Sequence, residues 1–88
     1  MPNTFTILIV DDDTDIGAML KMMMEYKGYS VMLLNKADKT IETLHNNSIK
    51  LVILDMLIAG INGTDVCQKI RNDKHISHIP ILMISALP

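Results

Sequence analysis

The strongest constraint on the fold is a run of apolar residues that stops at a carboxylate. Residues 51–54 read Leu-Val-Ile-Leu without any polar alternation, and Asp55 follows them directly. An uninterrupted run of this length is typical of a strand buried on both faces, as in parallel sheets. Residues 7–10, Ile-Leu-Ile-Val, form a second run that stops at the acidic triplet 11–13. The sequence therefore predicts buried strands with carboxylates at their C-terminal ends.

Segments with helical spacing separate these runs. Strands that alternate with helices at this spacing indicate successive right-handed β-α-β units and a parallel sheet. Asp13 is a suitable N-cap for the first helix, and Gly28 is a suitable C-terminal stop. Residues 56–63 are expected to be an apolar loop, and residues 73–78 a polar connection. The predicted strands are 6–10, 29–34, 51–55 and 81–85, and the predicted helices are 14–27, 37–45 and 64–72.

The first predicted helix is rich in methionine. Met19 and Met23 fall on the same helical stripe as Ile16 and are expected to face the core, whereas Met22 and Met24 flank that stripe. Methionine is an adaptable side chain that fills irregular space in a core. We therefore interpret this cluster as core packing.

The bulk properties limit the class of protein. Eighty-eight residues make one small domain, and a net charge of −2 argues against direct nucleic-acid binding by this segment. A single cysteine, Cys67, excludes an internal disulfide and fits a reducing compartment. No secretion signal and no run of membrane-spanning length is visible. We expect a soluble, cytoplasmic protein without membrane contact.

The acidic residues predict a metal site. The carboxyl ends of parallel strands lie along one edge of the sheet, which is where open α/β sheets bind ligands. Asp11, Asp12 and Asp55 would repel one another there unless a hard cation such as Mg²⁺ lay among them. Ser85, which ends the last apolar run, would add a hydroxyl to the same edge.

Four motifs in order resemble the receiver domain of two-component response regulators, over essentially the whole chain. They are Ile-Leu-Ile-Val-Asp-Asp-Asp at 7–13, Leu-Val-Ile-Leu-Asp at 51–55, Ile-Asn-Gly at 61–63 and Ile-Pro-Ile-Leu-Met-Ile-Ser-Ala at 79–86. The resemblance implies a flavodoxin-like three-layer α/β fold with strand order 2-1-3-4. It also implies a phosphorelay function, in which a sensor histidine kinase or phosphotransfer protein donates a phosphoryl group and the domain is not an enzyme in the ordinary sense.

The resemblance assigns a role to each matching residue. Asp55 matches the phosphoacceptor, and Asp11 and Asp12 match the acidic pair that holds Mg²⁺ together with it. The backbone carbonyl of Leu57 matches the remaining protein ligand of the metal. Ser85 matches the switch hydroxyl, and the Ala86 backbone amide would lie beside the phosphoryl oxygens.

Two other functions remain open at this point. Haloacid-dehalogenase-like phosphatases also place acidic residues after a first strand, and Asp11, Asp13 and Ser85 fit that pattern, but Asp55 would then have no role. A receiver-like module that is never phosphorylated and works through its surfaces is the second alternative. Binding of a phosphate analogue would separate these two possibilities from a phosphorylated receiver domain.

The resemblance also predicts how much of the family's domain residues 1–88 contain. The family carries a fifth strand ending in lysine, with two further helices, and we therefore expect a C-terminally incomplete receiver domain. Its fourth strand, 81–85, would then have an unpaired hydrophobic edge. We expect this edge to pair with that of a second copy in a homodimer centred on residues 80–88.

Overall fold

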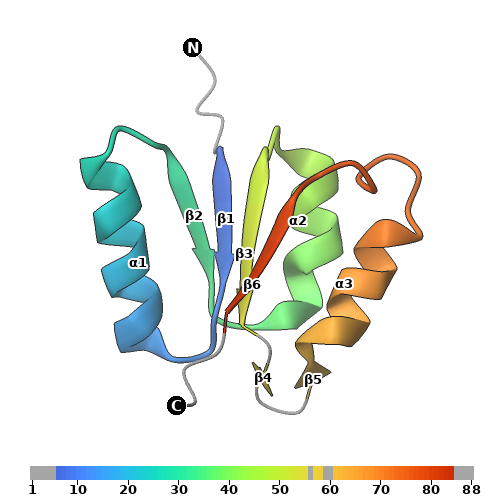
Figure 1. Cartoon of the computed structure of the whole chain (residues 1–88), viewed down its shortest axis with the longest axis horizontal. Coiled ribbons are helices and arrows are strands. Elements are labelled where there is room, and N and C mark those ends of the chain that lie inside the picture. Colours follow the sequence, from blue (N-terminus) through green and yellow to red (C-terminus); the bar gives the residue numbers. More distant parts are fainter. Residues whose placement is uncertain (1–5, 56, 59–60, 85–88) are drawn as a thin grey trace.

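The chain folds around a four-stranded parallel sheet. The computed structural model describes residues 6–55, 57–58 and 61–84 (Figure 1). The strand order β2-β1-β3-β6 confirms the order 2-1-3-4 predicted from sequence, and helices cover both faces of the sheet (Figure 1). The four strands are β1 (Ile7–Val10), β2 (Val31–Leu34), β3 (Leu51–Asp55) and β6 (Ile81–Ile84).

The two central strands are buried on both faces, as their unbroken apolar runs predict. All four residues of β1 are buried, and so are the last four of β3. Successive side chains of a strand point to opposite faces. Leu8 and Val10 accordingly join one hydrophobic cluster, whereas Ile7 and Ile9 join another on the opposite face.

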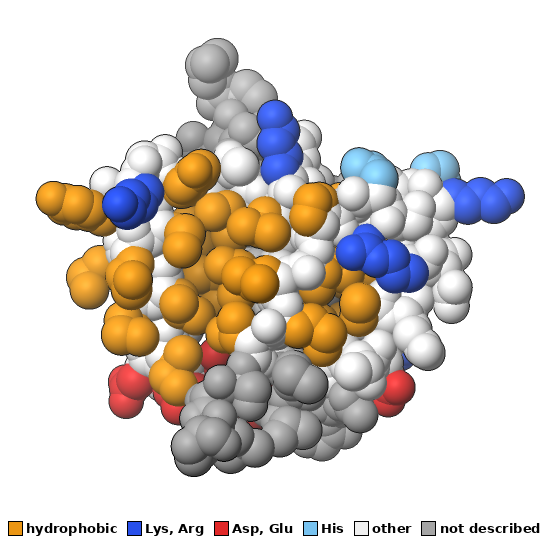
Figure 2. Space-filling view, viewed as in Figure 1, with side chains coloured by type: hydrophobic (Ala, Val, Ile, Leu, Met, Phe, Trp, Pro, Cys, Tyr) orange, Lys and Arg blue, Asp and Glu red, His pale blue; other side chains and the backbone are white. Residues whose placement is uncertain are grey.

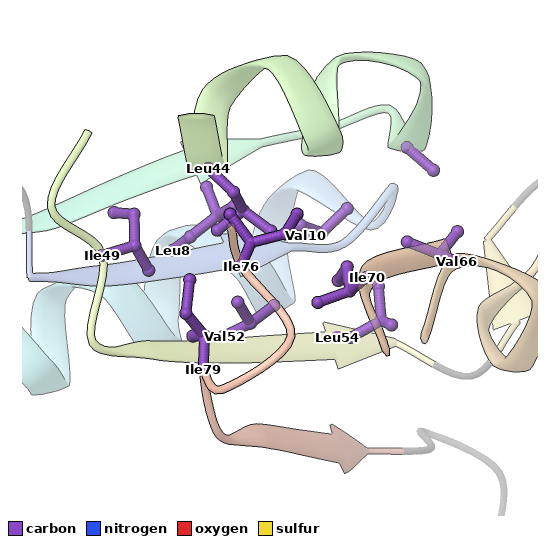
Figure 3. Close-up of a cluster of buried hydrophobic side chains, with 11 residues drawn as sticks. Leu8, Val10, Leu44, Ile49, Val52, Leu54, Val66, Ile70, Ile76 and Ile79 are labelled. Carbon is purple, nitrogen blue, oxygen red and sulfur yellow. The ribbon is translucent and has the colours of Figure 1, made fainter. Parts of the chain in front are cut away.

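The larger cluster lies between the sheet and two helices (Figure 3). These are α2 (Thr40–Asn46), which follows the 3-10 turn η1 (Ala37–Lys39), and α3 (Gly63–Arg71). Leu44 and Ile70 supply buried side chains from the two helices. Ile76 and Ile79 are also buried in this cluster, so the connection after α3 anchors itself in the core through isoleucines between its polar residues.

Helix α1 (Thr14–Tyr26) covers the other face of the sheet. The Asp13 side chain accepts hydrogen bonds from the backbone N–H groups of Asp15 and Ile16, both at 3.0 Å, which confirms it as the N-cap. Gly28 follows the helix with a φ of 98°, the left-handed conformation that favours glycine at a helix end.

The prediction that Met19 and Met23 face the core is wrong. Their exposed fractions are 49% and 51%, whereas Met24 packs against the smaller cluster. The reason is Gly17, which lies so close to β2 that a Cβ atom there would stand 2.9 Å from Leu33 Cδ1. This close approach sets the buried side of α1, and it turns Met19 and Met23 toward solvent.

The segment after β3 also differs from the expected loop. Two short antiparallel strands, β4 (Leu57–Ile58) and β5 (Ile61–Asn62), form a hairpin just before α3. Strands of two residues are too short to produce a readable periodicity, so the sequence pattern did not reveal them.

The last strand, β6, lies at the edge of the sheet, and within the described ranges no further strand pairs with its outer side. Pairing of this edge with a second copy stays a prediction. None of the helices in the described part of the chain has the length and apolar character needed to cross a membrane.

One polar contact ties α2 to the connection after α3. His45 Nε2 lies 2.6 Å from Asp73 Oδ2, and the hydrogen bond to His45 holds the pKa of Asp73 below its ordinary 3.8. A carboxylate whose pKa is lower in the folded state contributes stability above its unfolded-state pKa and loses that contribution as the pH falls through the folded-state pKa.

We therefore predict that Asp73→Asn destabilises the fold at neutral pH, and that the difference from the parent chain disappears in acid, below pH 3.8. Urea unfolding at a series of pH values measures both effects. Asp38→Asn, which changes an exposed carboxylate outside this contact, is the matched control. A destabilisation of Asp73→Asn that persisted unchanged into acid would contradict the role assigned to the hydrogen bond between His45 and Asp73.

Candidate functional site

Three aspartates meet at the carboxyl ends of β1 and β3. Asp11 follows β1 directly, Asp55 is the last residue of β3, and the two strands are in register with Val10 beside Leu54. One carboxylate oxygen from each of Asp11, Asp12 and Asp55 lies within 4.8 Å of the others. The cluster is therefore a product of parallel strand register, as the sequence predicted.

The three carboxylates differ in their exposure to solvent. Asp11 is only 2% exposed and Asp55 only 8%, whereas Asp12 is half-buried. Two of the three acidic groups of the site are thus withdrawn from water.

Backbone hydrogen bonds hold Asp11 in place. Its backbone N–H donates to the carbonyl of Leu34 in β2 at 3.0 Å. Its side-chain Oδ1 accepts from the backbone N–H of Asp13 at 2.9 Å. The turn that leads into α1 therefore orients the Asp11 carboxylate, and the same turn contains the Asp13 cap. Sequence reasoning did not anticipate this contact, although a carboxylate two residues before an N-cap is compatible with such a turn.

The electrostatic environment disfavours the ionised form of Asp11. Burial raises the pKa of this carboxyl above its ordinary 3.8, and the negative charges of Asp55 and Asp12 raise it further. The hydrogen bond from the Asp13 N–H opposes the rise. A bound cation would reverse this balance, because it favours the ionised carboxylates.

The donor set fits a hard divalent cation. Carboxylate oxygens are the ligands that Mg²⁺ prefers, and the ion commonly takes one or two carboxylates and keeps several waters. In the part of the chain that the structure describes, these three aspartates are the only group of three or more His, Cys, Asp or Glu side chains close enough to share a metal ion. The cluster is compatible with the predicted Mg²⁺.

The remaining residues predicted for the site fall into two groups. Leu57 begins β4, two residues beyond Asp55, and the role of its carbonyl stays a prediction. Ser85 and Ala86 lie outside the described residues. Asp13 is exposed and serves as the cap of α1, so the phosphatase alternative, which needed Asp13 and gave Asp55 no role, loses its support.

Comparison with known proteins gives a consistent result. The sequence profile of the response regulator receiver domain matches residues 7–87. Among curated relatives, the uncharacterized transcriptional regulatory protein YrkP of Bacillus subtilis (strain 168) is 39% identical over 82 residues, which are 93% of this chain and 34% of that protein. The regulatory protein VanR of Enterococcus faecium is 37% identical over 79 residues, which are 90% of this chain and 33% of that protein.

The solved structures agree with the sequence relatives. The N-terminal domain of a response regulator receiver protein from Methanoculleus marisnigri JR1 superimposes with a TM-score of 0.88 at 30% identity, covering 98% of this chain and 70% of that one. Relative to the curated proteins YrkP and VanR, this chain spans about a third of the full length.

The acidic cluster leads to a prediction about stability. We expect Asp12→Asn to raise the melting temperature in a chelator, because it removes one repulsion among carboxylates within 4.8 Å. A gain of about 1 kcal/mol, allowing for solvent screening at this half-buried site, corresponds to roughly 4–8 °C for a domain of this size. The same change should reduce the further stabilisation that Mg²⁺ gives, because it removes a charged ligand.

Thermal unfolding with chelator and across a Mg²⁺ titration measures both quantities. Asp38→Asn removes an exposed carboxylate elsewhere and should change neither. Equal Mg²⁺ affinity in Asp12→Asn and the parent chain would remove Asp12 from the site.

Proposed function

Because the chain belongs to the response regulator receiver domain family, we propose that it accepts a phosphoryl group on Asp55 in a two-component signalling pathway. The donor is the phosphohistidine of a sensor histidine kinase or a phosphotransfer protein. The observation that carries the proposal is the meeting of Asp11, Asp12 and Asp55 at one edge of the sheet. The domain acts as a signalling element in the cytoplasm, without ordinary enzymatic turnover.

The strand arrangement supports Asp55 as the acceptor. Asp55 ends β3, which lies between β1 and β6, so it has strand ends on both sides. Asp11 is less suited to this role, because it is the more buried of the two residues. On the other side, Ile84 of β6 pairs with Asp55, and Ser85 is the next residue in the sequence.

The transfer itself requires little from the protein beyond positioning and charge. A carboxylate oxygen of Asp55 forms a bond to phosphorus while the phosphorus–nitrogen bond of the donor breaks, and the electron pair of that bond leaves with the imidazole. Asp11, Asp12 and Asp55, with the Leu57 carbonyl, would hold Mg²⁺. When bound, the ion would neutralise the negative charge shared by the acceptor and the incoming phosphoryl oxygens.

The residues after β6 would report the phosphorylated state. The Ser85 hydroxyl would donate a hydrogen bond to a phosphoryl oxygen, and the Ala86 backbone amide would donate a second. Such charge-assisted bonds are among the stronger hydrogen bonds in proteins.

The first test is site-specific phosphorylation by an acyl phosphate in the presence of Mg²⁺. We expect the label on Asp55, its loss in Asp55→Asn, and its loss when Mg²⁺ is removed. Mass spectrometry of the intact chain and its peptides measures this. Asp13→Asn is the matched control, because asparagine also caps helices and this variant should retain the label.

Two results would contradict the assignment. A label on a residue other than Asp55 would show that the acceptor is misplaced. An unlabelled chain that still folds and binds Mg²⁺ would favour the alternative of a receiver-like module that works through its surfaces alone.

A separate prediction concerns Ser85. We expect Ser85→Ala to keep Asp55 as the labelled residue but to weaken retention of the phosphorylated state. Loss of a hydrogen bond to a charged group is worth roughly 1.5–3 kcal/mol, or about ten- to a hundred-fold. The decay of the label with time measures the effect, and Ser85→Thr, which keeps the hydroxyl, should restore it. Equal decay in Ser85→Ala and the parent chain would remove Ser85 from the switch.

A further inference from the structure

All three histidines of the chain lie at one end of the molecule. His45 belongs to the last turn of α2, and His75 and His78 belong to the connection after α3. The rings of His45 and His75 contact each other edge-on, with centroids 5.8 Å apart and planes inclined at 65°. Figure 2 shows histidine side chains next to one another, at the opposite edge of the molecule from the acidic side chains. The acidic site uses none of these histidines.

The contact with Asp73 determines which nitrogen of His45 is available. His45 Nε2 lies 2.6 Å from Asp73 Oδ2. An ionised carboxylate only accepts hydrogen bonds, so the proton of this contact belongs to Nε2. In a neutral imidazole the other nitrogen, Nδ1, then has a free lone pair. Histidines that bind metals usually donate their other ring N–H to a carboxylate in this way, which orients the ring. Asp73 therefore prepares His45 to coordinate a metal through Nδ1.

The ring of His75 lies at a distance that one metal ion can bridge. Zinc lies about 2.0–2.1 Å from an imidazole nitrogen, which places the ring centre roughly 3.2 Å from the ion. Two rings that share an ion therefore have centres at most about 6.4 Å apart. His45 and His75 meet this limit at 5.8 Å. Both side chains are exposed, so each ring can turn toward an ion without disturbing the core.

The backbone that carries His75 is held in place. Its N–H donates to Asp73 Oδ1 at 3.0 Å, so the carboxylate that contacts His45 also positions His75. The next residue, Ile76, is buried, and Arg71 Nη1 donates to the Ile79 carbonyl at 2.7 Å. Ligands on such fixed supports lose little freedom when they bind an ion.

A groove beside His75 provides room for an ion with its waters. His75 and His78 line this groove together with Asn47 and Ser48, and its volume is about 300 Å³. Every lining residue belongs to the segments 44–50 and 75–79, so the groove is built entirely within the described ranges. Outside the acidic cluster, the described residues contain no group of three His, Cys, Asp or Glu side chains close enough to share an ion. The site therefore offers two protein nitrogens, and water fills the other positions.

We propose that His45 and His75 bind a divalent transition-metal ion such as Zn²⁺. Imidazole nitrogen suits zinc, copper and nickel, whereas Mg²⁺ prefers oxygen ligands, so the ion differs in class from the one that fits the aspartates. His45 precedes β3 and His75 precedes β6, which places the ion at the amino ends of the strands, away from the acidic site. The bound ion ties α2 to the connection after α3. This site goes beyond the proposed phosphorelay function and does not depend on it.

Calorimetric titration with Zn²⁺, in a buffer that contains excess Mg²⁺ to saturate the acidic cluster, tests the proposal. We expect one Zn²⁺ per chain, and loss of this binding in His45→Gln and in His75→Gln. His78→Gln is the matched control, because it removes an exposed histidine of the same groove and leaves the contacting pair intact. It should bind Zn²⁺ as the parent does. All three variants change exposed side chains, and circular dichroism checks that they fold.

A second probe, Cu²⁺, identifies the ligand atoms. We expect the electron paramagnetic resonance spectrum of the Cu²⁺-loaded chain to show coupling to imidazole nitrogen. The coupling should weaken in His75→Gln and remain unchanged in His78→Gln.

Asp73 acts in this site as a positioning residue, and its effect has a separate test. Asp73→Asn should weaken Zn²⁺ binding about ten- to a hundred-fold, because it changes the group that orients His45. The ring nitrogen chemical shifts of His45 should show the Nε2–H form in the parent chain and a loss of that preference in Asp73→Asn. A purely structural role of Asp73 would leave the ratio of the two ring forms unchanged.

Three outcomes would overturn the proposal. The first is a parent chain that binds no Zn²⁺ when Mg²⁺ is in excess. The second is Zn²⁺ binding that survives in both His45→Gln and His75→Gln, or that is lost in His78→Gln alone, because either result would place the ion elsewhere. The third is a Cu²⁺ spectrum without nitrogen coupling.

Discussion

The structure depends on the burial of β1 and β3 on both faces. The residues of these strands join hydrophobic clusters on either side of the sheet, which removes both faces of their apolar runs from water. Parallel pairing in register then brings the residues that follow the strands to one edge. The acidic site is a consequence of core packing: the hydrophobic effect holds Asp11 and Asp55 together against their mutual repulsion.

This arrangement places mutually repelling carboxylates at the carboxyl ends of β1 and β3. Burial and neighbouring charge raise the pKa of Asp11, and a single backbone N–H, that of Asp13, opposes the effect. The carboxylates of the site repel one another. The electrostatic energy of the site therefore changes when a cation or a phosphoryl group is added, because either one alters its charge. The contact of Asp11 with the start of α1 also links the acidic site to the orientation of that helix.

Helix α1 has one side packed against the sheet and one side exposed to solvent. Gly17 allows it to approach Leu33 closely, and this contact directs Leu20 and Met24, which are partly buried, toward the smaller cluster. On the other side of the helix, Met19, Met22 and Met23 are exposed as a result. One glycine thus decides which of the apolar residues in a methionine-rich helix face the sheet.

The sequence by itself determined the parallel sheet and the acidic cluster, and its resemblance to receiver domains implied the strand order. The reason is that unbroken apolar runs ending in Asp11 and Asp55 are compatible with few arrangements other than a parallel sheet, and the cap at Asp13 and the stop at Gly28 are local backbone chemistry. Only the tertiary structure decided which face of α1 is buried, because helical periodicity defines a stripe without choosing between neighbouring stripes of similar hydrophobicity. It also decided the hairpin of β4 and β5 and the contact between His45 and Asp73, since each joins short or distant segments whose meeting depends on how the rest of the chain packs.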